Sequence, residues 1–177
     1  MTKTLLEMSN LQQVDRNESI QLAPMVEEIF TDLTPLAEKS GIALELAGDG
    51  VMTGSDALIY RMIFNLTENA IKYNRPDGSV QVCITQEPEK LLILVSDTGR
   101  GIPEEYQQSI FQPFFRVDKS RSRTFGGAGL GLALVWEIAA LHGGSVRVAE
   151  SSDSGTTIAA ELPRSGNHAA APKNETL

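Results

Sequence analysis

A polar stretch between two apolar runs, Asp97 to Leu132, constrains the fold of this chain more than any other feature. It begins as DTGRGIP directly after Leu91–Val95, which predicts a buried strand, and it closes as GGAGLGL where residues 130–135 predict the start of a helix. A loop of about thirty residues is uncommon in a compact domain unless it serves as a lid or a binding loop. Because glycines at both ends let the backbone approach a ligand closely, the stretch predicts a mobile lid over a bound ligand.

Length and composition indicate one domain of a water-soluble protein. The 177 residues are 41% hydrophobic, and no segment approaches the roughly 20 apolar residues that span a bilayer. No signal pattern is present, so we expect a cytoplasmic domain whose parent protein can still be anchored in the inner or plasma membrane. The net charge of −8 argues against nucleic acid as a main partner.

Cysteine and histidine offer little chemistry in this chain. Cys83 is the single cysteine, which excludes an internal disulfide, and its place in an apolar strand pattern predicts a core position. We expect His142 at a helix end, either as a partner of the helix dipole or on the surface. No Ser/His/Asp or Cys/His nucleophilic constellation can be assembled.

Apolar periodicity and turn residues predict a mixture of strands and helices. Strands joined mainly by hairpins, together with three helices, indicate the α/β class, in the form of a two-layer α/β sandwich with a mixed sheet packed on three helices. The expected helices are 24–40, 55–73 and 130–142, and the expected strands are 19–22, 42–46, 51–53, 79–86, 90–96, 145–149 and 156–162.

Four polar residues share one stripe of the helix expected at 55–73. Asn65, Glu68, Asn69 and Lys72 are spaced at i, i+3, i+4 and i+7. Asparagine is a poor interior helix former, its amide oxygen is a hard ligand suited to Mg²⁺, and lysine can meet a phosphate as a point charge. The stripe therefore fits a metal and phosphate site, although a solvated helix face has the same pattern.

Asp97 and a later glycine cluster are the other candidate ligand groups. Asp97 ends a predicted strand, where its carboxylate can accept a hydrogen bond from an exocyclic amine or can be an ordinary turn aspartate. The sequence of residues 126–131, GGAGLG, precedes a helix, so its backbone N–H groups and the helix N-terminus can face phosphate. It fits neither GxGxxG nor a P-loop, and glycine for turn geometry alone stays an alternative.

The predicted lid carries both charge and aromatic rings. Arg116, Lys119, Arg121 and Arg123 can fold over an anion, or they are solvated loop charges. The phenylalanines of the segment 111–115 are too apolar to remain in water. We therefore expect these rings to anchor the lid or to meet a partner.

Taken in order, NLTENAIKYN, DTGRGIP, IFQPFFRVDKSRS and GGAGLGL resemble the N, G1, F and G2 boxes of the ATP-binding catalytic domain of sensor histidine kinases. The resemblance runs from about Gln21 to Pro163. It extends to the superfamily that also contains the DNA gyrase, heat-shock chaperone and mismatch-repair ATPases. One glycine motif is weak support, whereas four boxes in order with fitting spacings are specific. The resemblance implies the Bergerat fold, a long ATP lid, and bound ATP with Mg²⁺.

The resemblance also implies roles for individual residues. Asn69 resembles the principal Mg²⁺ ligand, with Asn65 beside it, and Lys72 resembles a phosphate-contacting lysine. Asp97 matches the acceptor of the adenine amine. Arg116 matches the lid arginine that approaches the γ-phosphate, so Asn69, Lys72 and Arg116 are expected to serve catalysis. The remaining nucleotide-binding residues that the resemblance implies are Tyr73 against adenine, Gly99, Gly101 and Ile102 in the pocket, and Gly127, Ala128, Gly129, Leu130 and Gly131 at the phosphates.

Three positions bear on the kind of activity that the resemblance implies. Ala128 stands where Thr or Ser is usual, which removes one hydroxyl from the lid, and Phe115 stands where Tyr is frequent. In the gyrase-like ATPases the position of Asn65 is a glutamate that activates water, and an amide has no useful basicity for that task. Asn65 therefore favours phosphoryl transfer over hydrolysis.

The resemblance and the composition also divide the chain. Residues 1–14 resemble the end of a preceding dimerisation-domain helix, 15–163 form the catalytic domain, and 164–177 are expected to be a disordered tail. The phospho-accepting histidine belongs to that separate dimerisation domain, a response regulator is an indirect partner, and we expect the isolated catalytic domain to be monomeric. Two alternatives stay open: an ATP-dependent regulatory module without transfer, and a gyrase-type ATPase.

Overall fold

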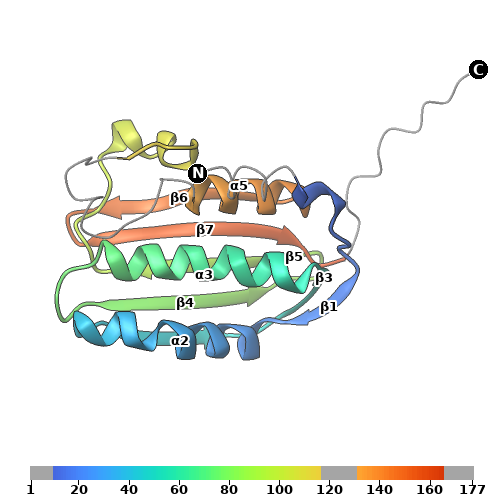
Figure 1. Cartoon of the computed structure of the whole chain (residues 1–177), viewed down its shortest axis with the longest axis horizontal. Helices are drawn as coiled ribbons and strands as arrows, with labels where there is room; N and C mark the ends of the chain where they lie inside the picture. Colours follow the sequence, from blue (N-terminus) through green and yellow to red (C-terminus); the bar gives the residue numbers. More distant parts are fainter. Residues whose placement is uncertain (1–9, 117–130, 166–177) are drawn as a thin grey trace, which may run out of the picture.

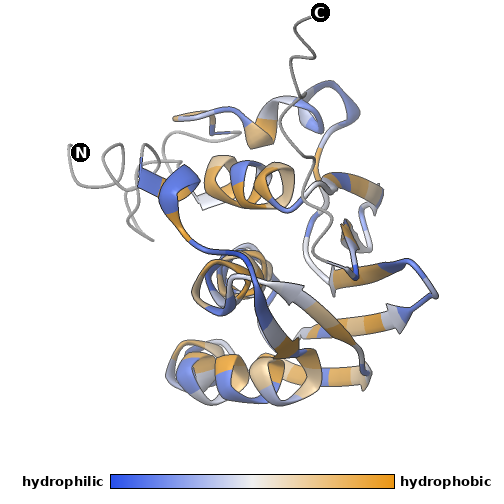
Figure 2. Ribbon diagram, turned by 90° about the vertical axis from the view of Figure 1, so that its right-hand side faces the viewer, coloured by the Kyte–Doolittle hydropathy of each residue, from blue (hydrophilic) through white to orange (hydrophobic). Residues whose placement is uncertain are grey.

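The computed structural model describes residues 10–116 and 131–165, and these form two layers (Figure 1). Seen from the side, helices lie in one layer and strands in the other (Figure 2). The predicted two-layer α/β sandwich with a mixed sheet is confirmed. The elements are η1 (Leu11–Gln13), β1 (Glu18–Gln21), α2 (Leu22–Lys39), β2 (Ala43–Gly48), β3 (Val51–Gly54), α3 (Asp56–Lys72), β4 (Ser79–Gln86), β5 (Lys90–Asp97), η2 (Glu104–Tyr106), η3 (Ser109–Phe111), α5 (Gly131–Leu141), β6 (Ser145–Ser152) and β7 (Gly155–Pro163).

The strands form a five-stranded sheet in the order β2-β4-β5-β7-β6 and a two-stranded sheet of β1 and β3. β2 and β4 are parallel, and the other neighbours are antiparallel. The expectation of hairpin connections therefore fails at β2 and β3, which follow one another in the chain but pair in different sheets. Gly48 has a φ of 80°, and a Cβ there would lie 2.0 Å from the Ile84 carbonyl oxygen. Only glycine lets the chain pass β4 so closely before it leaves the large sheet.

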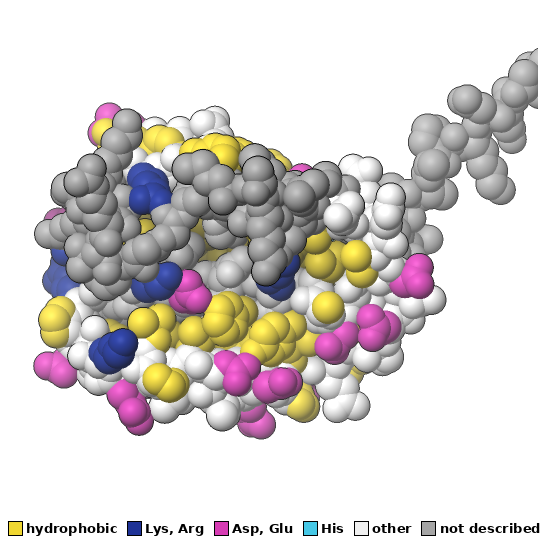
Figure 3. All heavy atoms as spheres, in the orientation of Figure 1, with side chains coloured by type: hydrophobic (Ala, Val, Ile, Leu, Met, Phe, Trp, Pro, Cys, Tyr) yellow, Lys and Arg dark blue, Asp and Glu magenta, His cyan; other side chains and the backbone are white. Residues whose placement is uncertain are grey.

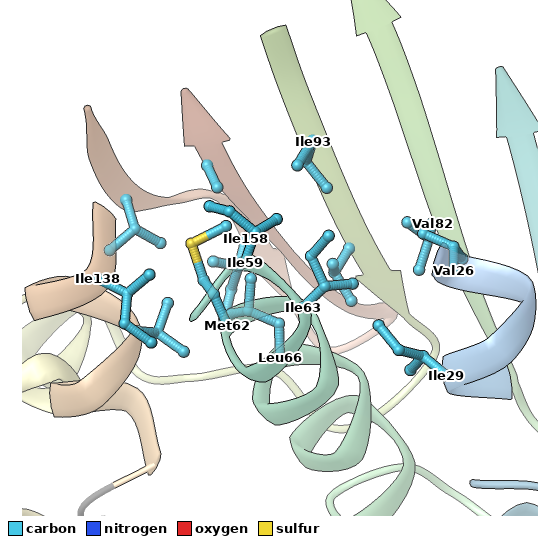
Figure 4. Packing of buried hydrophobic residues seen from close by; sticks show 14 of the residues in the cluster. Val26, Ile29, Ile59, Met62, Ile63, Leu66, Val82, Ile93, Ile138 and Ile158 are labelled. Atoms are coloured by element: carbon cyan, nitrogen blue, oxygen red, sulfur yellow. The ribbon is translucent and has the colours of Figure 1, made fainter. Parts of the chain in front are cut away.

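Helix α3 lies at the centre of the core (Figure 4). Its side chains Ile59, Met62, Ile63 and Leu66 are at most 1% exposed and lie between the sheet and the flanking helices α2 and α5. Truncating one such side chain to alanine costs about 2–5 kcal/mol of stability. The apolar stripe therefore fixes the rotation of α3, and with it the direction of its polar stripe.

The N-terminus of α3 is capped by Ser55 and also by a buried imidazole. The Ser55 hydroxyl accepts a hydrogen bond from the Leu58 N–H at 3.3 Å, and the Ser55 N–H donates to His142 Nε2 at 3.1 Å. His142 is 1% exposed, and its Nδ1 lies 2.8 Å from the Ile138 carbonyl oxygen. The surface alternative was wrong, because the turn before α3 folds over the end of α5 and buries the ring. The expected place at a helix end is confirmed, since the ring bonds a carbonyl of the last turn of α5.

Cys83 also differs from its prediction. Its neighbours Val82 and Ile84 are buried against the helices, whereas Cys83 is only half-buried and pairs in register with Leu94. Since successive side chains of a strand point to opposite faces, Cys83 lies on the sheet face away from the helices. The alternation of side chains between the two faces of the sheet, rather than the apolar character of the strand alone, determines the position of Cys83.

The outer surface of the helix layer combines aromatic and acidic side chains. Figure 3 shows hydrophobic side chains gathered across the helix layer, with acidic side chains along the lower edge over α2. Tyr60 stacks with Phe64 at a centroid distance of 6.0 Å, and its hydroxyl donates to Asp32. Burial and this hydrogen bond raise the pKa of Tyr60 to about 12. None of the helices in the described ranges has both the length and the apolar character that a membrane crossing requires.

Candidate functional site

The polar stripe of α3 is present as predicted. Asn65, Glu68, Asn69 and Lys72 are all half-buried, at the margin of the helix face that packs into the core. Lys72 Nζ lies 2.6 Å from Glu68 Oε1, one turn earlier on the same helix. The stripe thus presents two amides and an ion pair beside the core.

Asp97 ends β5 with one of its carboxylate oxygens already engaged. Asp97 Oδ1 accepts hydrogen bonds from the backbone N–H groups of Gly99 at 2.9 Å and Thr156 at 3.2 Å. Burial raises the pKa of Asp97, and these two donors lower it to a smaller extent. For Oδ2, the structure gives no partner among the residues that it describes. The carboxylate is therefore fixed through one oxygen and can accept a donor from a ligand through the other.

The loop after Asp97 meets the C-terminal end of α3. A Cβ on Gly99 would lie 2.6 Å from the Tyr73 carbonyl oxygen, and Thr98 Oγ1 donates to Asn74 Oδ1 at 2.9 Å. Tyr73, 55% exposed, follows directly after Lys72. The structure therefore brings the end of β5 and the C-terminal turn of α3 to the same end of the molecule, on the left of Figure 1.

The same loop rests on the tip of the β6–β7 hairpin. The Ile102 N–H donates to Ser151 Oγ at 2.7 Å. Gly101 has a φ of 81°, and a Cβ there would lie 2.1 Å from the Ser152 carbonyl oxygen. On the other side, a Cβ on Gly155 would lie 1.9 Å from the Asp97 carbonyl oxygen. Gly101 and Gly155 are thus required by close backbone approach, and the hairpin tip holds the loop in place.

The phenylalanines that precede the undescribed part of the lid divide into two groups. Phe111 is buried and lies 5.6 Å from the ring of Trp136 in α5, while Phe115 lies 5.8 Å from Tyr106. These two rings leave water, as expected. Phe114 stays in contact with water, since it is 47% exposed. Its backbone is also in the left-handed region, with a φ of 65°.

Comparison with known proteins gives the family. Residues 54–166 match the family model of histidine kinase-, DNA gyrase B- and HSP90-like ATPases, which is more than half of the chain. The chain belongs to this family. Its predicted resemblance to the ATP-binding catalytic domain of sensor histidine kinases is confirmed by the relatives below.

Two relatives from bacteria illustrate the similarity. The sensor histidine kinase RppB of Synechocystis sp. is 34% identical over 166 residues, which are 90% of this chain and 36% of RppB. The sensor-like histidine kinase SenX3 of Mycolicibacterium smegmatis is 34% identical over 168 residues, 92% of this chain and 44% of SenX3. The chain thus spans less than half the length of these curated relatives.

Solved structures share the fold. The mycobacterial sensor histidine kinase MprB has a TM-score of 0.73 at 27% identity and covers 83% of this chain and 97% of its own. The histidine kinase ThkA, in its complex with the response regulator TrrA, has a TM-score of 0.74 at 23% identity, covering 93% of this chain and 46% of its own. The second likeness shows the fold alone.

The donor set of this ATPase-family domain suits Mg²⁺. Among the described residues, no group of three or more His, Cys, Asp or Glu side chains could hold a metal ion. Mg²⁺ needs no such cage, because it binds through few protein oxygens and completes an octahedron with water and phosphate oxygens. The amides of Asn65 and Asn69, one turn apart on one stripe, fit that requirement.

The lid residues of this family member are described only in part. Arg116 is half-buried and is the last residue before the gap, and Gly131 opens α5. A Cβ on Gly131 would meet no described atom within 4 Å. The other predicted lid residues lie outside the described residues: Lys119, Arg121, Arg123, Gly127, Ala128, Gly129 and Leu130.

Proposed function

We propose that this domain binds ATP with Mg²⁺ and presents the γ-phosphate to a histidine on a separate dimerisation domain. The observation that carries the proposal is the contact between the loop of Asp97 and the C-terminal turn of α3. It brings a carboxylate, one of whose oxygens has no described partner, to the C-terminal end of a helix whose polar stripe bears two amides and a lysine. ATP carries its adenine base and its phosphate chain on one skeleton, so one nucleotide can meet groups that lie at the same end of the molecule.

Asp97 and its loop form the base side of the proposed site. Asp97 Oδ2 accepts a hydrogen bond from the exocyclic amine of adenine, while Oδ1 keeps its two backbone donors. Tyr73 is exposed enough to lie against the ring. Gly99, Gly101 and Ile102 shape the adjoining loop.

The polar stripe of α3 forms the phosphate side. Asn69, with Asn65 beside it, would hold Mg²⁺, which when bound neutralises phosphate charge. Lys72 and Arg116 supply positive charge to the phosphates. Phosphoryl transfer depends mainly on positioning and charge stabilisation, so these residues need no covalent chemistry.

The side chains near the metal position favour transfer over hydrolysis. Asn65 lacks the basicity to activate water. Glu68 is the nearest carboxylate in sequence, and it is engaged with Lys72 at 2.6 Å. The proposed acceptor is therefore a histidine of a dimerisation domain of the parent protein, which then serves a response regulator in the cytoplasm.

The test combines the purified chain with the separately produced dimerisation domain of its parent and ATP labelled at the γ-phosphate. We expect Mg²⁺-dependent label on that domain, and we expect Asn69→Ala to abolish it. Asn17→Ala, at an exposed position before β1, is the matched control and should transfer normally.

The outcomes separate the proposed function from its alternatives. Saturable ATP binding without transfer would overturn the kinase proposal in favour of a regulatory module. Steady hydrolysis by the chain alone, lost in Asn65→Ala, would instead identify a gyrase-type ATPase. Equal transfer by Asn69→Ala and the parent would remove Asn69 from the proposed site.

A further inference from the structure

Three separate segments are tied together by a closed ring of hydrogen bonds beside the proposed site. Asn74 follows the C-terminal end of α3, Ser79 begins β4, and Thr98 follows β5. Thr98 Oγ1 donates to Asn74 Oδ1 at 2.9 Å, and it accepts from the Ser79 N–H at 2.9 Å. Asn74 Nδ2 donates to the Ser79 carbonyl oxygen at 2.9 Å, which closes the ring.

The ring leaves no space for an additional atom. A Cβ on Gly78 would lie 2.4 Å from both Asn74 Oδ1 and Thr98 Oγ1. Asn74 Oδ1 also accepts from the Arg75 N–H at 2.8 Å, and the Thr98 N–H donates to the Ser79 carbonyl oxygen at 3.3 Å. Both side chains are therefore held by several partners and are packed closely on the Gly78 side, although Thr98 is exposed and Asn74 is half-buried.

The ring lies within two residues of each half of the proposed nucleotide site. Asn74 lies two residues after Lys72, the last phosphate-side residue of α3, and Thr98 directly follows Asp97 on the base side. Each half also has supports of its own, since α3 is fixed by its buried face and Asp97 by two backbone donors. The ring joins the halves through side chains, at the point where α3 ends and the loop begins.

We propose that Asn74 and Thr98 are positioning residues that set the spacing between the adenine-binding carboxylate and the metal-binding turn of α3. This inference rests on the proposed function. A ligand that contacts both halves through one covalent skeleton needs the correct spacing, whereas a ligand that contacts only one half does not. ATP affinity should therefore depend on the ring, and adenosine affinity should not.

The experiment compares Thr98→Val, which removes the hydroxyl at nearly constant shape, with Thr98→Ser, which keeps it. Dissociation constants are measured for Mg-ATP by calorimetry and for adenosine by NMR titration at millimolar concentration. We expect Thr98→Val to weaken Mg-ATP binding about five- to tenfold, the loss of one or two hydrogen bonds. Thr98→Ser should stay within about twofold of the parent, and adenosine affinity should be equal in all three chains.

A double-mutant cycle tests whether Asn74 and Thr98 act together on Mg-ATP affinity. Asn74→Ala should weaken Mg-ATP binding to a similar extent, and the double variant should lose little more than the larger single loss, because either change alone opens the ring at the bond that the two residues share. Thr85→Val, at an exposed position near the other end of β4, is the matched control and should bind normally. If Asn74→Ala does not fold, the Thr98 pair alone decides.

Three results would overturn the inference. These are unchanged Mg-ATP affinity in Thr98→Val, an equal loss for adenosine and Mg-ATP, and a double variant whose losses multiply. Failure of the parent chain to bind Mg-ATP at all is a different result, because it refutes the proposed function itself.

Discussion

The base side and the phosphate side of the proposed site are built in different ways. On the base side, Asp97 is fixed by two backbone donors, and its loop is tied to Ser151 and to Asn74. On the phosphate side, the one side-chain bond that the structure gives within the described α3 stripe joins Lys72 to Glu68. The base side is ordered by the fold, whereas the described residues of the phosphate side have a fixed backbone and few polar side-chain contacts with one another.

The entropic cost of ordering side chains on binding therefore differs between the two sides. Side chains that are already held lose little conformational freedom when a ligand arrives, whereas a long lysine loses about 1–2 kcal/mol of rotamer entropy when it is fixed. The base side should therefore bind adenine as a rigid contact, and a substitution there should lower nucleotide affinity strongly. Phosphate binding should depend on metal, salt and neighbouring charge.

The largest effect is expected at the base side, from Asp97→Asn. The amide oxygen can still accept from Gly99 and Thr156, but the amide NH₂ then faces the adenine amine, so donor meets donor. We expect Mg-ATP affinity to fall about 100-fold, the upper range for an unpaired buried polar group, in a calorimetric titration. A loss below threefold would mean that the base side does not recognise adenine through Asp97.

The control for this substitution is Asp153→Asn, at an exposed position in the tip of the β6–β7 hairpin. It makes the same chemical change outside the carboxylate pocket and should leave Mg-ATP affinity unchanged. The amide of Asp97→Asn can donate to the 6-oxo group of guanine, so the preference for ATP over GTP should narrow in that variant alone.

The next effect concerns the metal on the phosphate side. Asn69→Ala removes an oxygen ligand, and we expect Mg-ATP affinity to fall about tenfold, as is common for changes around metal sites. Titrations with excess EDTA should give equal ATP affinities for Asn69→Ala and the parent, because the lost contact needs Mg²⁺. A tenfold loss that persists in EDTA would show that Asn69 acts on the nucleotide or the fold rather than through the metal.

A smaller effect concerns the stability of the ligand-free base side as the pH changes. Burial raises the pKa of Asp97 above its ordinary 3.8, so the folded state favours the protonated carboxyl. That contribution to the free energy of unfolding is fully present below pH 3.8 and is lost as the pH rises through the raised pKa. Urea unfolding from pH 7 downward should therefore show the parent gaining stability relative to Asp97→Asn. The opposite trend would mean that the two backbone donors outweigh burial.

The parts of the site that the sequence predicts are those set by local spacing. The α3 stripe follows from residues three and four apart, and Asp97 follows from the end of an apolar strand. Apart from the Gly99 N–H, the supports of the base side are not local, since Ser151 bonds a residue 49 positions away and Thr156 one 59 positions away. His142 meets Ser55 across 87 positions. Small polar residues such as these carry no periodic pattern, so their pairing depends on how the sheet and the hairpin tip come together.

The smallest effect is expected at the Lys72–Glu68 ion pair of the phosphate side. Lys72 and Glu68 are 19% and 28% exposed, and an i,i+4 ion pair on a helix that water still reaches contributes less than about 1 kcal/mol. Glu68→Gln frees Lys72 for the phosphates and removes a negative charge beside them. We therefore expect Mg-ATP to bind about twofold more tightly at low salt, with the gain screened away near 1 M salt.

Glu38→Gln, exposed near the end of α2, is the control and should show no gain. If Glu68→Gln instead weakens binding severalfold, then Glu68 holds Lys72 in its binding position. The phosphate side would then also be ordered before the ligand arrives, and the contrast between the two sides would disappear.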